Sequence, residues 1–146
     1  MSPVPAMQRA KPGFTLMELL VVLMIIGLLA SIAVPIYLNR ADKARLQKVD
    51  VDFETLSTAL HLYKLDNGML PTTEQGLQAL VVKPSRQPVP GHYKDGGYLR
   101  ELPADPWQHA YQYLVPSRDG TREFEIISLG ADGKVGGQDQ DADLYY

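Results

Sequence analysis

The chain has 146 residues, with 17 acidic and 14 basic side chains and a formal net charge of −3. The length suits a single domain, and the mildly acidic balance argues against the broad phosphate neutralisation that nucleic-acid binding requires. Cysteine is absent, which excludes disulfides, thiolate metal sites and a cysteine nucleophile.

A basic leader and a long apolar block open the chain. Residues 19–38 contain no charged side chain, and as a helix they would span about 30 Å, the thickness of a bilayer's hydrocarbon core. Arg9 and Lys11 precede the block with no acidic residue before them, a pattern that keeps a leader in the cytoplasm. Basic residues also follow the block, so charge alone favours this orientation only weakly. We expect a leader at 1–13 and a transmembrane helix at 14–38.

Two other interpretations of this block remain open, and Glu18 bears on both. A core helix is usually shorter than a full membrane span. A cleaved secretory signal peptide is the stronger alternative, because residues 31–33 form a small-x-small cleavage site. Glu18 favours a retained anchor, since a carboxylate there costs about 3 kcal/mol on insertion scales and has no use in an ordinary signal peptide.

The role of Glu18 itself has two explanations. It lies in the headgroup region as an acid favoured by the helix macrodipole, or it pairs with a cation that another chain places at the same depth. A new α-amino group at Phe14 would be such a cation if the leader were removed after Gly13.

A helical pattern resumes after Pro35 in amphipathic form. No Gly or Pro interrupts residues 36–67, and Asn67-Gly68 is a typical helix end. The sequence predicts one helix from about Thr15 to Asp66, weakened or kinked at Pro35, with an amphipathic half at 39–66. Six apolar residues recur at spacings of three and four, as in a helix that lies on an apolar partner, or in a short coiled coil: Leu46, Val49, Phe53, Leu56, Leu60 and Tyr63.

The rest of the chain, residues 67–146, predicts a small globular head. We expect a short helix at Glu74–Val82, followed by an irregular stretch rich in proline. Two strand patterns, Ala110–Val115 and Glu123–Leu129, are joined by a hairpin loop over residues 116–121. The predicted fold class is therefore α+β, with a long N-terminal helix packed on a small antiparallel sheet. A globular head of this size buries little apolar surface and usually needs an additional stabilising link, here called a staple.

An acidic tail could supply that staple. Residues 130–146 carry four aspartates and one lysine among several glycines. Oxygen donors without histidine or cysteine suit a hard cation such as calcium. The tail is not an EF-hand, because it lacks that motif's glycine at position six and glutamate at position twelve. Composition alone would also allow a disordered acidic tail.

Catalytic motifs are missing from the sequence. It contains no GxSxG, no phosphate-binding glycine loop and no HExxH. The three histidines, His61, His92 and His109, lie in different segments without an obvious carboxylate or serine partner. Trp107, Tyr111 and Tyr113 are interpreted as core and edge aromatics of the sheet. We therefore expect a protein that is not an enzyme.

The sequence around Gly13 resembles a known processing site. Residues 13–18, GFTLME, followed by the apolar helix, are similar to the GFTLxE site of the type IV pilin-like family, in which a prepilin peptidase cuts after the glycine and methylates the new N-terminus. The resemblance implies cleavage between Gly13 and Phe14, and N-methylation of Phe14. It further implies an assembly role for Glu18, which would pair with the N-terminus of a neighbouring subunit.

Four later segments resemble the major pseudopilins of type II secretion systems: YKLDNG at 63–68, LPTTEQGL at 70–77, LPADPW at 102–107 and SLGADG at 128–133. In that family calcium replaces the disulfide that closes the C-terminal region of major pilins. The resemblance implies a Ca²⁺ site, with Asp139 as an additional candidate and with these ligands: Asp132, Asp141, Asp143 and the backbone carbonyl of Leu129.

The resemblance also implies a function. The chain would be a structural subunit that polymerises into the helical periplasmic pseudopilus and drives export of folded proteins across the outer membrane. Its partners would be further copies of itself, minor pseudopilins, the prepilin peptidase, an inner-membrane assembly platform and the membrane. The N-terminus would be cytoplasmic, and residues 39–146 would form a periplasmic domain on the bacterial inner membrane. Alternatives are a type IV pilus subunit for adhesion, motility or DNA uptake, and a secreted calcium-binding module.

Overall fold

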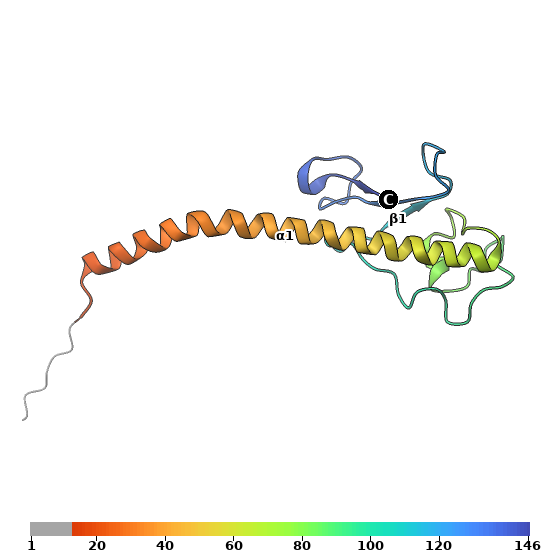
Figure 1. Cartoon of the computed structure of the whole chain (residues 1–146), viewed down its shortest axis with the longest axis horizontal. Helices are drawn as coiled ribbons and strands as arrows, with labels where there is room; N and C mark the ends of the chain where they lie inside the picture. Colours follow the sequence, from red (N-terminus) through yellow and green to blue (C-terminus); the bar gives the residue numbers. More distant parts are fainter. Residues whose placement is uncertain (1–12) are drawn as a thin grey trace, which may run out of the picture. The chain divides into compact units, whose positions relative to one another are not determined.

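The computed structural model describes residues 13–146 and divides into two units, one up to Arg40 and one over Ala41–Tyr146. Helix α1, Leu16–Asn67, runs for 52 residues (Figure 1), which confirms the predicted long helix to within one residue at each end. The helix continues across Pro35, so the expected weakening there does not break it. The predicted leader, apart from Gly13, lies outside the described residues.

The first unit is an apolar helix that begins with a defined cap. Thr15 Oγ1 accepts a hydrogen bond from the Glu18 backbone N–H at 3.1 Å, which satisfies one of the free donors of the first turn. The segment Leu16–Val34 is long and apolar enough to cross a membrane, and none of it is buried within the structure. A continuous uncovered apolar surface of this kind needs lipid or other subunits to cover it.

In the second unit, one face of α1 forms the core. Five of the six residues in the predicted apolar seam are almost completely buried, with at most 4% exposed: Val49, Phe53, Leu56, Leu60 and Tyr63. The expectation for the sixth, Leu46, is wrong, since it remains 46% exposed. At its level α1 faces a cavity of about 400 Å³, which Trp107 and Leu144 also line.

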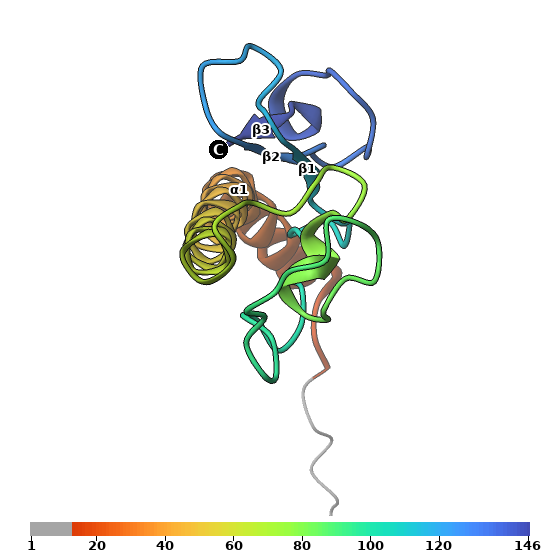
Figure 2. The same cartoon turned by 90° about the vertical axis from the view of Figure 1, so that its right-hand side faces the viewer.

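A three-stranded antiparallel sheet packs on this face (Figure 2). The strands are β1, Gln112–Leu114, β2, Glu125–Ser128, and β3, Leu144–Tyr145. The first two confirm the predicted hairpin, although both are shorter than the sequence pattern. The third strand pairs antiparallel with β2 and was not predicted. The chain end is therefore part of the sheet.

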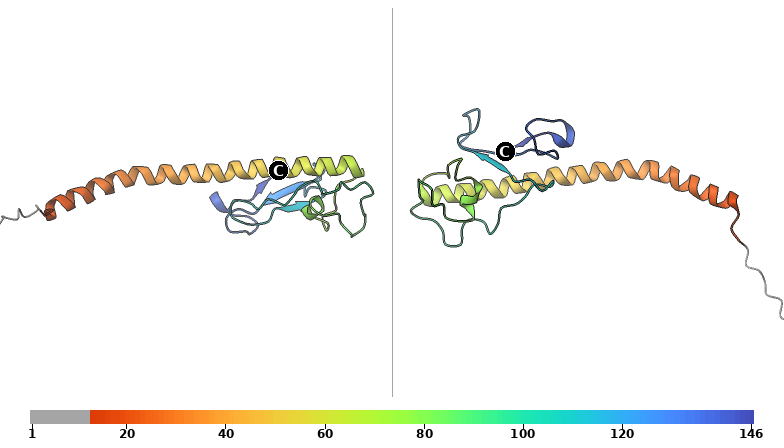
Figure 3. Two further views of the ribbon diagram at one scale, coloured as in Figure 1. Left: turned by 90° about the horizontal axis from the view of Figure 1, so that it is seen from below. Right: turned by 180° about the vertical axis from the view of Figure 1, so that it is seen from behind.

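The expected helix at Glu74–Val82 is reduced to η1, a 3₁₀ helix at Leu77–Leu80, as Figure 3 shows from two further sides. Gly76 has a φ of 62°, a left-handed conformation that an α-helix cannot contain. A regular helix therefore cannot extend through this position. The Gln75 side chain braces the segment by donating hydrogen bonds to the carbonyls of Arg86 and Pro88, at 2.8 and 3.0 Å.

Candidate functional site

The predicted processing residues lie at the start of α1. Gly13 and Phe14 precede the helix, and the Phe14 side chain is 79% exposed. Apart from its chain neighbours, nothing among the described residues lies within 4 Å of the position that a Cβ at Gly13 would occupy. An exposed segment without helical structure is one that a peptidase can bind in an extended conformation. Glu18 lies in the first turn of α1, where the helix macrodipole favours a carboxylate.

The C-terminal loop, residues 129–143, folds tightly around the backbone of Asp141. A Cβ at Gly130 or at Gly137 would each lie 2.7 Å from the Asp141 carbonyl carbon. The Ala131 N–H closes the loop by donating to the Gln140 carbonyl at 2.8 Å. The glycines of the tail therefore permit a close approach between backbone segments.

The predicted calcium ligands are distributed along this loop. Asp143 Oδ2 accepts hydrogen bonds from the Gly136 N–H and the Tyr145 hydroxyl, both at 2.9 Å. Asp143 Oδ1 is buried and has no hydrogen-bond partner within residues 13–146. Asp132 is exposed, and its Oδ1 accepts the Lys134 N–H at 3.0 Å. Asp141 is also exposed.

The oxygen donors of the loop are the ligand type that a hard cation prefers, but their side chains are not gathered around one point. A buried carboxylate oxygen without a partner is costly, and a bound cation would satisfy Asp143 Oδ1. Among the residues that the structure describes, however, no three histidine, cysteine, aspartate or glutamate side chains gather as a metal site. Backbone carbonyls such as that of Leu129 would have to complete the coordination.

A buried carboxylate below this loop was missed by the sequence analysis. Asp105 is 0% exposed. It accepts hydrogen bonds from the backbone N–H groups of Trp107 and His109, at 3.0 and 2.7 Å, and from the Ser128 hydroxyl at 2.8 Å. Asp105-Pro106 begins a turn, in which the Gln108 N–H donates to the Asp105 carbonyl at 3.0 Å. The same residue also fastens that turn to β2.

Two of the histidines have the partners that the sequence analysis did not find. His109 Nδ1 lies 3.1 Å from the Gly130 carbonyl oxygen and 3.9 Å from Asp105 Oδ2. His61 Nδ1 lies 2.8 Å from the Ser57 carbonyl oxygen. The His61 contact is local, because Ser57 lies one helical turn earlier. The His109 contact is structural, because the Asp105 carboxylate already accepts three hydrogen bonds. His109 thus connects the buried aspartate to the base of the C-terminal loop.

The aromatic residues take the core and edge positions that the sequence predicted. Tyr111 and Tyr113 are buried, and Trp107 is partly buried against the same cluster. The Tyr111 hydroxyl donates to Asp52 Oδ2 at 2.7 Å. Burial, followed by this hydrogen bond and the charge of Asp52, raises the pKa of Tyr111 above its ordinary value of 10. These phenols are therefore neutral structural groups.

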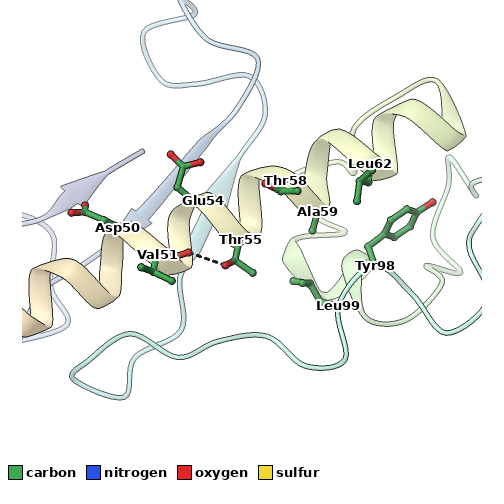
Figure 4. Close-up of a pocket in the computed structure, with 9 residues that line it drawn as sticks. All are labelled: Asp50, Val51, Glu54, Thr55, Thr58, Ala59, Leu62, Tyr98 and Leu99. Carbon is green, nitrogen blue, oxygen red and sulfur yellow. Dashed lines mark hydrogen bonds between the residues drawn. The ribbon is translucent and has the colours of Figure 1, made fainter.

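A second surface feature is an apolar groove on α1, with a volume of about 550 Å³ (Figure 4). Tyr98 and Leu99 form one wall, and α1 residues from Asp50 to Leu62 form the other. The backbone N–H groups of Tyr98 and Leu99 donate to the Leu80 carbonyl at 2.7 and 3.0 Å, and these hydrogen bonds hold the wall opposite α1 in place.

Comparison with known proteins accounts for nearly the whole chain. The family described as "Type II secretion system (T2SS), protein G" matches residues 36–146, and the "Prokaryotic N-terminal methylation motif" matches residues 8–34. The chain belongs to the type II secretion system protein G family. The methylation motif spans Gly13, Phe14 and Glu18, while the role of each single residue remains a prediction.

Relatives in this family are similar along almost their full length. The "Type II secretion system core protein G" of Pseudomonas aeruginosa is 47% identical over 137 residues, covering 94% of this chain and 95% of that protein. The Vibrio cholerae protein of the same name is 49% identical over 136 residues, covering 93% and 91%. The Klebsiella pneumoniae protein is 52% identical over 127 residues, covering 87% and 89%.

A solved structure confirms the fold of this protein G chain. The crystal structure of the major pseudopilin from the type 2 secretion system of enterohaemorrhagic Escherichia coli matches with a TM-score of 0.65 at 44% identity. The match covers 74% of this chain and 90% of that one. The predicted α+β pseudopilin fold and the sequence resemblance are therefore both confirmed.

Proposed function

We propose that this protein G chain is the major structural subunit of the pseudopilus of a type II secretion system. The observation that carries the proposal is the apolar segment Leu16–Val34, which is uncovered along its whole length and lies entirely within the match to the methylation motif, residues 8–34. Packing of these segments against one another would supply most of the cohesion of the fibre. One heterologous contact that is repeated without closing generates such a filament.

The subunit would first be an inner-membrane protein with a single span. Arg9 and Lys11 favour a cytoplasmic leader, and on that side a prepilin peptidase would cut after Gly13 and methylate Phe14. The second unit, Ala41–Tyr146, would be periplasmic. Minor pseudopilins and an inner-membrane assembly platform are the further partners that this role requires.

Glu18 is proposed to set the register between subunits. In hydrocarbon, a carboxylate and an ammonium are each costly alone and stabilise one another when paired. Glu18 lies in the first turn of α1, four residues after Phe14. The ammonium of Phe14 on a neighbouring copy would be its partner.

The test replaces Glu18 with alanine in the full-length chain. We expect Glu18→Ala to enter the membrane and to be processed, but to form few fibres, as scored by electron microscopy of sheared cells. Thr15→Ala is the matched control, because it removes the helix cap but keeps the charge, and it should assemble. Normal fibres from Glu18→Ala would contradict the pairing role.

We further propose that the C-terminal loop binds calcium. The donors would be Asp132, Asp141, Asp143 and the Leu129 carbonyl, and the support is the unpartnered buried oxygen Asp143 Oδ1 together with the donor chemistry. A bound ion would neutralise the carboxylates and fasten the segment that leads into β3. It would act as the staple that a head of this size needs.

Chelation tests this proposal. At a calcium concentration one hundred times the Kd, an ion that binds only the folded state stabilises it by about 2.7 kcal/mol. We expect EDTA to lower the melting temperature of the second unit in the purified protein, and calcium to restore it. Asp143→Asn should melt at the EDTA value whether calcium is present or not. A wild-type melting temperature that ignores EDTA would contradict the site.

A further inference from the structure

The second half of α1 has another apolar stripe, which no part of the chain that the structure describes covers. Val51, Thr55, Thr58 and Leu62 follow one another at spacings of four, three and four, so they share one face of the helix. Val51 is 64% exposed and Leu62 is 45% exposed. The buried seam that begins at Val49 lies on a different face. An amphipathic helix of a self-contained domain needs one apolar face, and this one has two.

The uncovered stripe forms the floor of the groove against Tyr98 and Leu99 (Figure 4). From Asp50 to Leu62 the groove extends for about 18 Å along the helix, at a rise of about 1.5 Å per residue. The lining is mainly apolar, with threonine methyl groups between the valine and the leucine. A groove of this shape suits an apolar side chain at the tip of a loop.

One end of the groove is acidic. Asp50 and Glu54 lie one turn apart on α1, and both line the groove. Neither carboxylate forms an ion pair or accepts a side-chain hydrogen bond within residues 13–146. The neighbouring acid Asp52, in contrast, is occupied by Lys48 and by the Tyr111 hydroxyl. The acidic end therefore favours an occupant that carries a positive charge beside its apolar group.

The C-terminal loop of the same chain displays such a pair. Val135 is 71% exposed, and the adjacent Lys134 is exposed and makes no ion pair among the described residues. Glycines with positive φ flank the pair on both sides, at Gly133 and Gly136. Both side chains of Lys134-Val135 are therefore exposed at a turn of the loop.

We infer that the groove on α1 receives Lys134-Val135 of a neighbouring copy of this chain. Val135 would fill the apolar floor next to Val51, and the Lys134 ammonium would lie between Asp50 and Glu54. The inference rests on the proposed assembly into a fibre and names the head-to-head contact within it.

The positions of the two surfaces suit a filament. In Figure 1 the C-terminal loop lies above the second half of α1 and the segment that contains Tyr98 and Leu99 lies below it, and in the end-on view of Figure 2 the two lie at the upper and lower right of the helix. The loop is fastened to α1 at Asp42, whose Oδ2 accepts the Gln140 amide at 3.0 Å. The acidic end of the groove lies eight to twelve residues further on, about 12–18 Å along the helix axis.

A parallel neighbour must therefore be displaced by about this distance before its loop reaches the groove. A contact between two different surfaces with an axial displacement is heterologous and repeats without closing. A second exposed pair of this type, Val82-Lys83, follows η1 closely, and the Leu80 carbonyl accepts hydrogen bonds from the groove wall. Val82-Lys83 therefore lies beside the groove on the same surface. If it entered the groove of a neighbouring copy, the same surface of both copies would meet, and the contact would close as a two-fold dimer.

Disulfide trapping tests the contact directly, because the chain has no cysteine of its own. The variant Val51→Cys, Val135→Cys is assembled in cells, fibres are oxidised with copper phenanthroline, and subunits are separated on non-reducing gels. A disulfide forms only if the two Cα atoms come within about 7 Å. We expect a ladder of dimers, trimers and larger multimers. The matched pair Val51→Cys, Val82→Cys should give no ladder.

A charge exchange provides the second readout. Lys134→Glu and Glu54→Lys should each reduce the yield of fibres, and the double variant should recover it, since the ion pair is restored with reversed polarity. Lys83→Glu is the matched control and should assemble normally. The melting temperature of each unassembled variant, measured in calcium, should equal that of the wild type.

The results separate this inference from the function on which it rests. If wild-type chains form fibres but the 51–135 pair does not cross-link, or the charge exchange fails to recover assembly, the contact is wrong and the proposed function stands. A ladder from the 51–82 pair would equally overturn it. If wild-type chains form no fibres at all, the proposed function and the inference are both wrong.

Discussion

Replacing Gly137 with alanine should disrupt the C-terminal loop much more than the same change at its neighbour Gly136. The two glycines have nearly the same backbone conformation, with φ of 103° and 98°. A Cβ at Gly137 would lie 2.7 Å from the Asp141 carbonyl carbon and still closer to its oxygen, whereas a Cβ at Gly136 would meet nothing within 4 Å beyond its chain neighbours in residues 13–146. The pair therefore isolates the effect of close backbone packing.

The expected magnitudes follow from these two geometries. Holding alanine at positive φ costs about 1–2 kcal/mol, and this cost applies to both variants. Gly137→Ala adds a clash with backbone, and overpacking of this kind costs about 1–3 kcal/mol. We expect a loss in the free energy of unfolding of about 1–2 kcal/mol for Gly136→Ala, and of about 2–5 kcal/mol for Gly137→Ala.

Urea unfolding in EDTA measures the difference without a contribution from any bound ion. Trp107 is the only tryptophan, and it lines one cavity together with Asp139, Gln140 and Ala142 of the loop, so its fluorescence reports on this region. The apolar segment Leu16–Val34 of α1 contains no tryptophan and does not contribute to the signal. Equal unfolding midpoints for the two variants would refute the packing around Asp141.

Two further predictions concern the core. Asp105→Ala leaves two backbone N–H groups and the Ser128 hydroxyl without their acceptor, so the free energy of unfolding should fall by at least about 3 kcal/mol. The exposed control Asp95→Ala should lower it by less than about 0.5 kcal/mol. Equal urea midpoints for the two variants would contradict the role of the buried carboxylate. Because burial raises the pKa of Tyr111 above 10, its stabilising contribution is complete below pH 10 and declines as the pH rises above 10, where the unfolded chain loses the phenol proton first. Tyr111→Phe should therefore flatten the alkaline decline in urea midpoint, and a decline as steep as that of the wild type would show that other groups cause it.

The parts of the fold that could be predicted are those determined by local pattern. The buried seam of α1 follows from spacings of three and four along a single helix. The β1–β2 hairpin follows from two runs of β-formers around a turn. Leu46 belongs to the same seam and yet remains half exposed, because its partners Trp107 and Leu144 come from distant parts of the chain and leave a cavity.

Other features depend on contacts that no local pattern reveals. Strand β3 has two residues, too few to show an alternating pattern, and it exists only because β2 offers a free edge. The buried state of Asp105 depends on Ser128, 23 residues further along the chain. The position of Gly76 before η1 was visible in the sequence, but its left-handed conformation, which shortens the expected helix, was not.

The candidate site divides in the same way. Gly13, Phe14 and Glu18 form one short contiguous motif, so the sequence located them without a fold. The tail aspartates were recognised as candidate ligands by composition and resemblance. Their arrangement around Asp141 arises from the packing of Gly130 and Gly137, which depends on how the loop closes.

The most direct test of the central claim is the intact mass and N-terminal sequence of the protein purified from membranes. A pseudopilus subunit should begin at Phe14 and carry one methyl group on its α-amino nitrogen. A chain that begins near Val34, or one that keeps its leader in assembled fibres, would contradict the account.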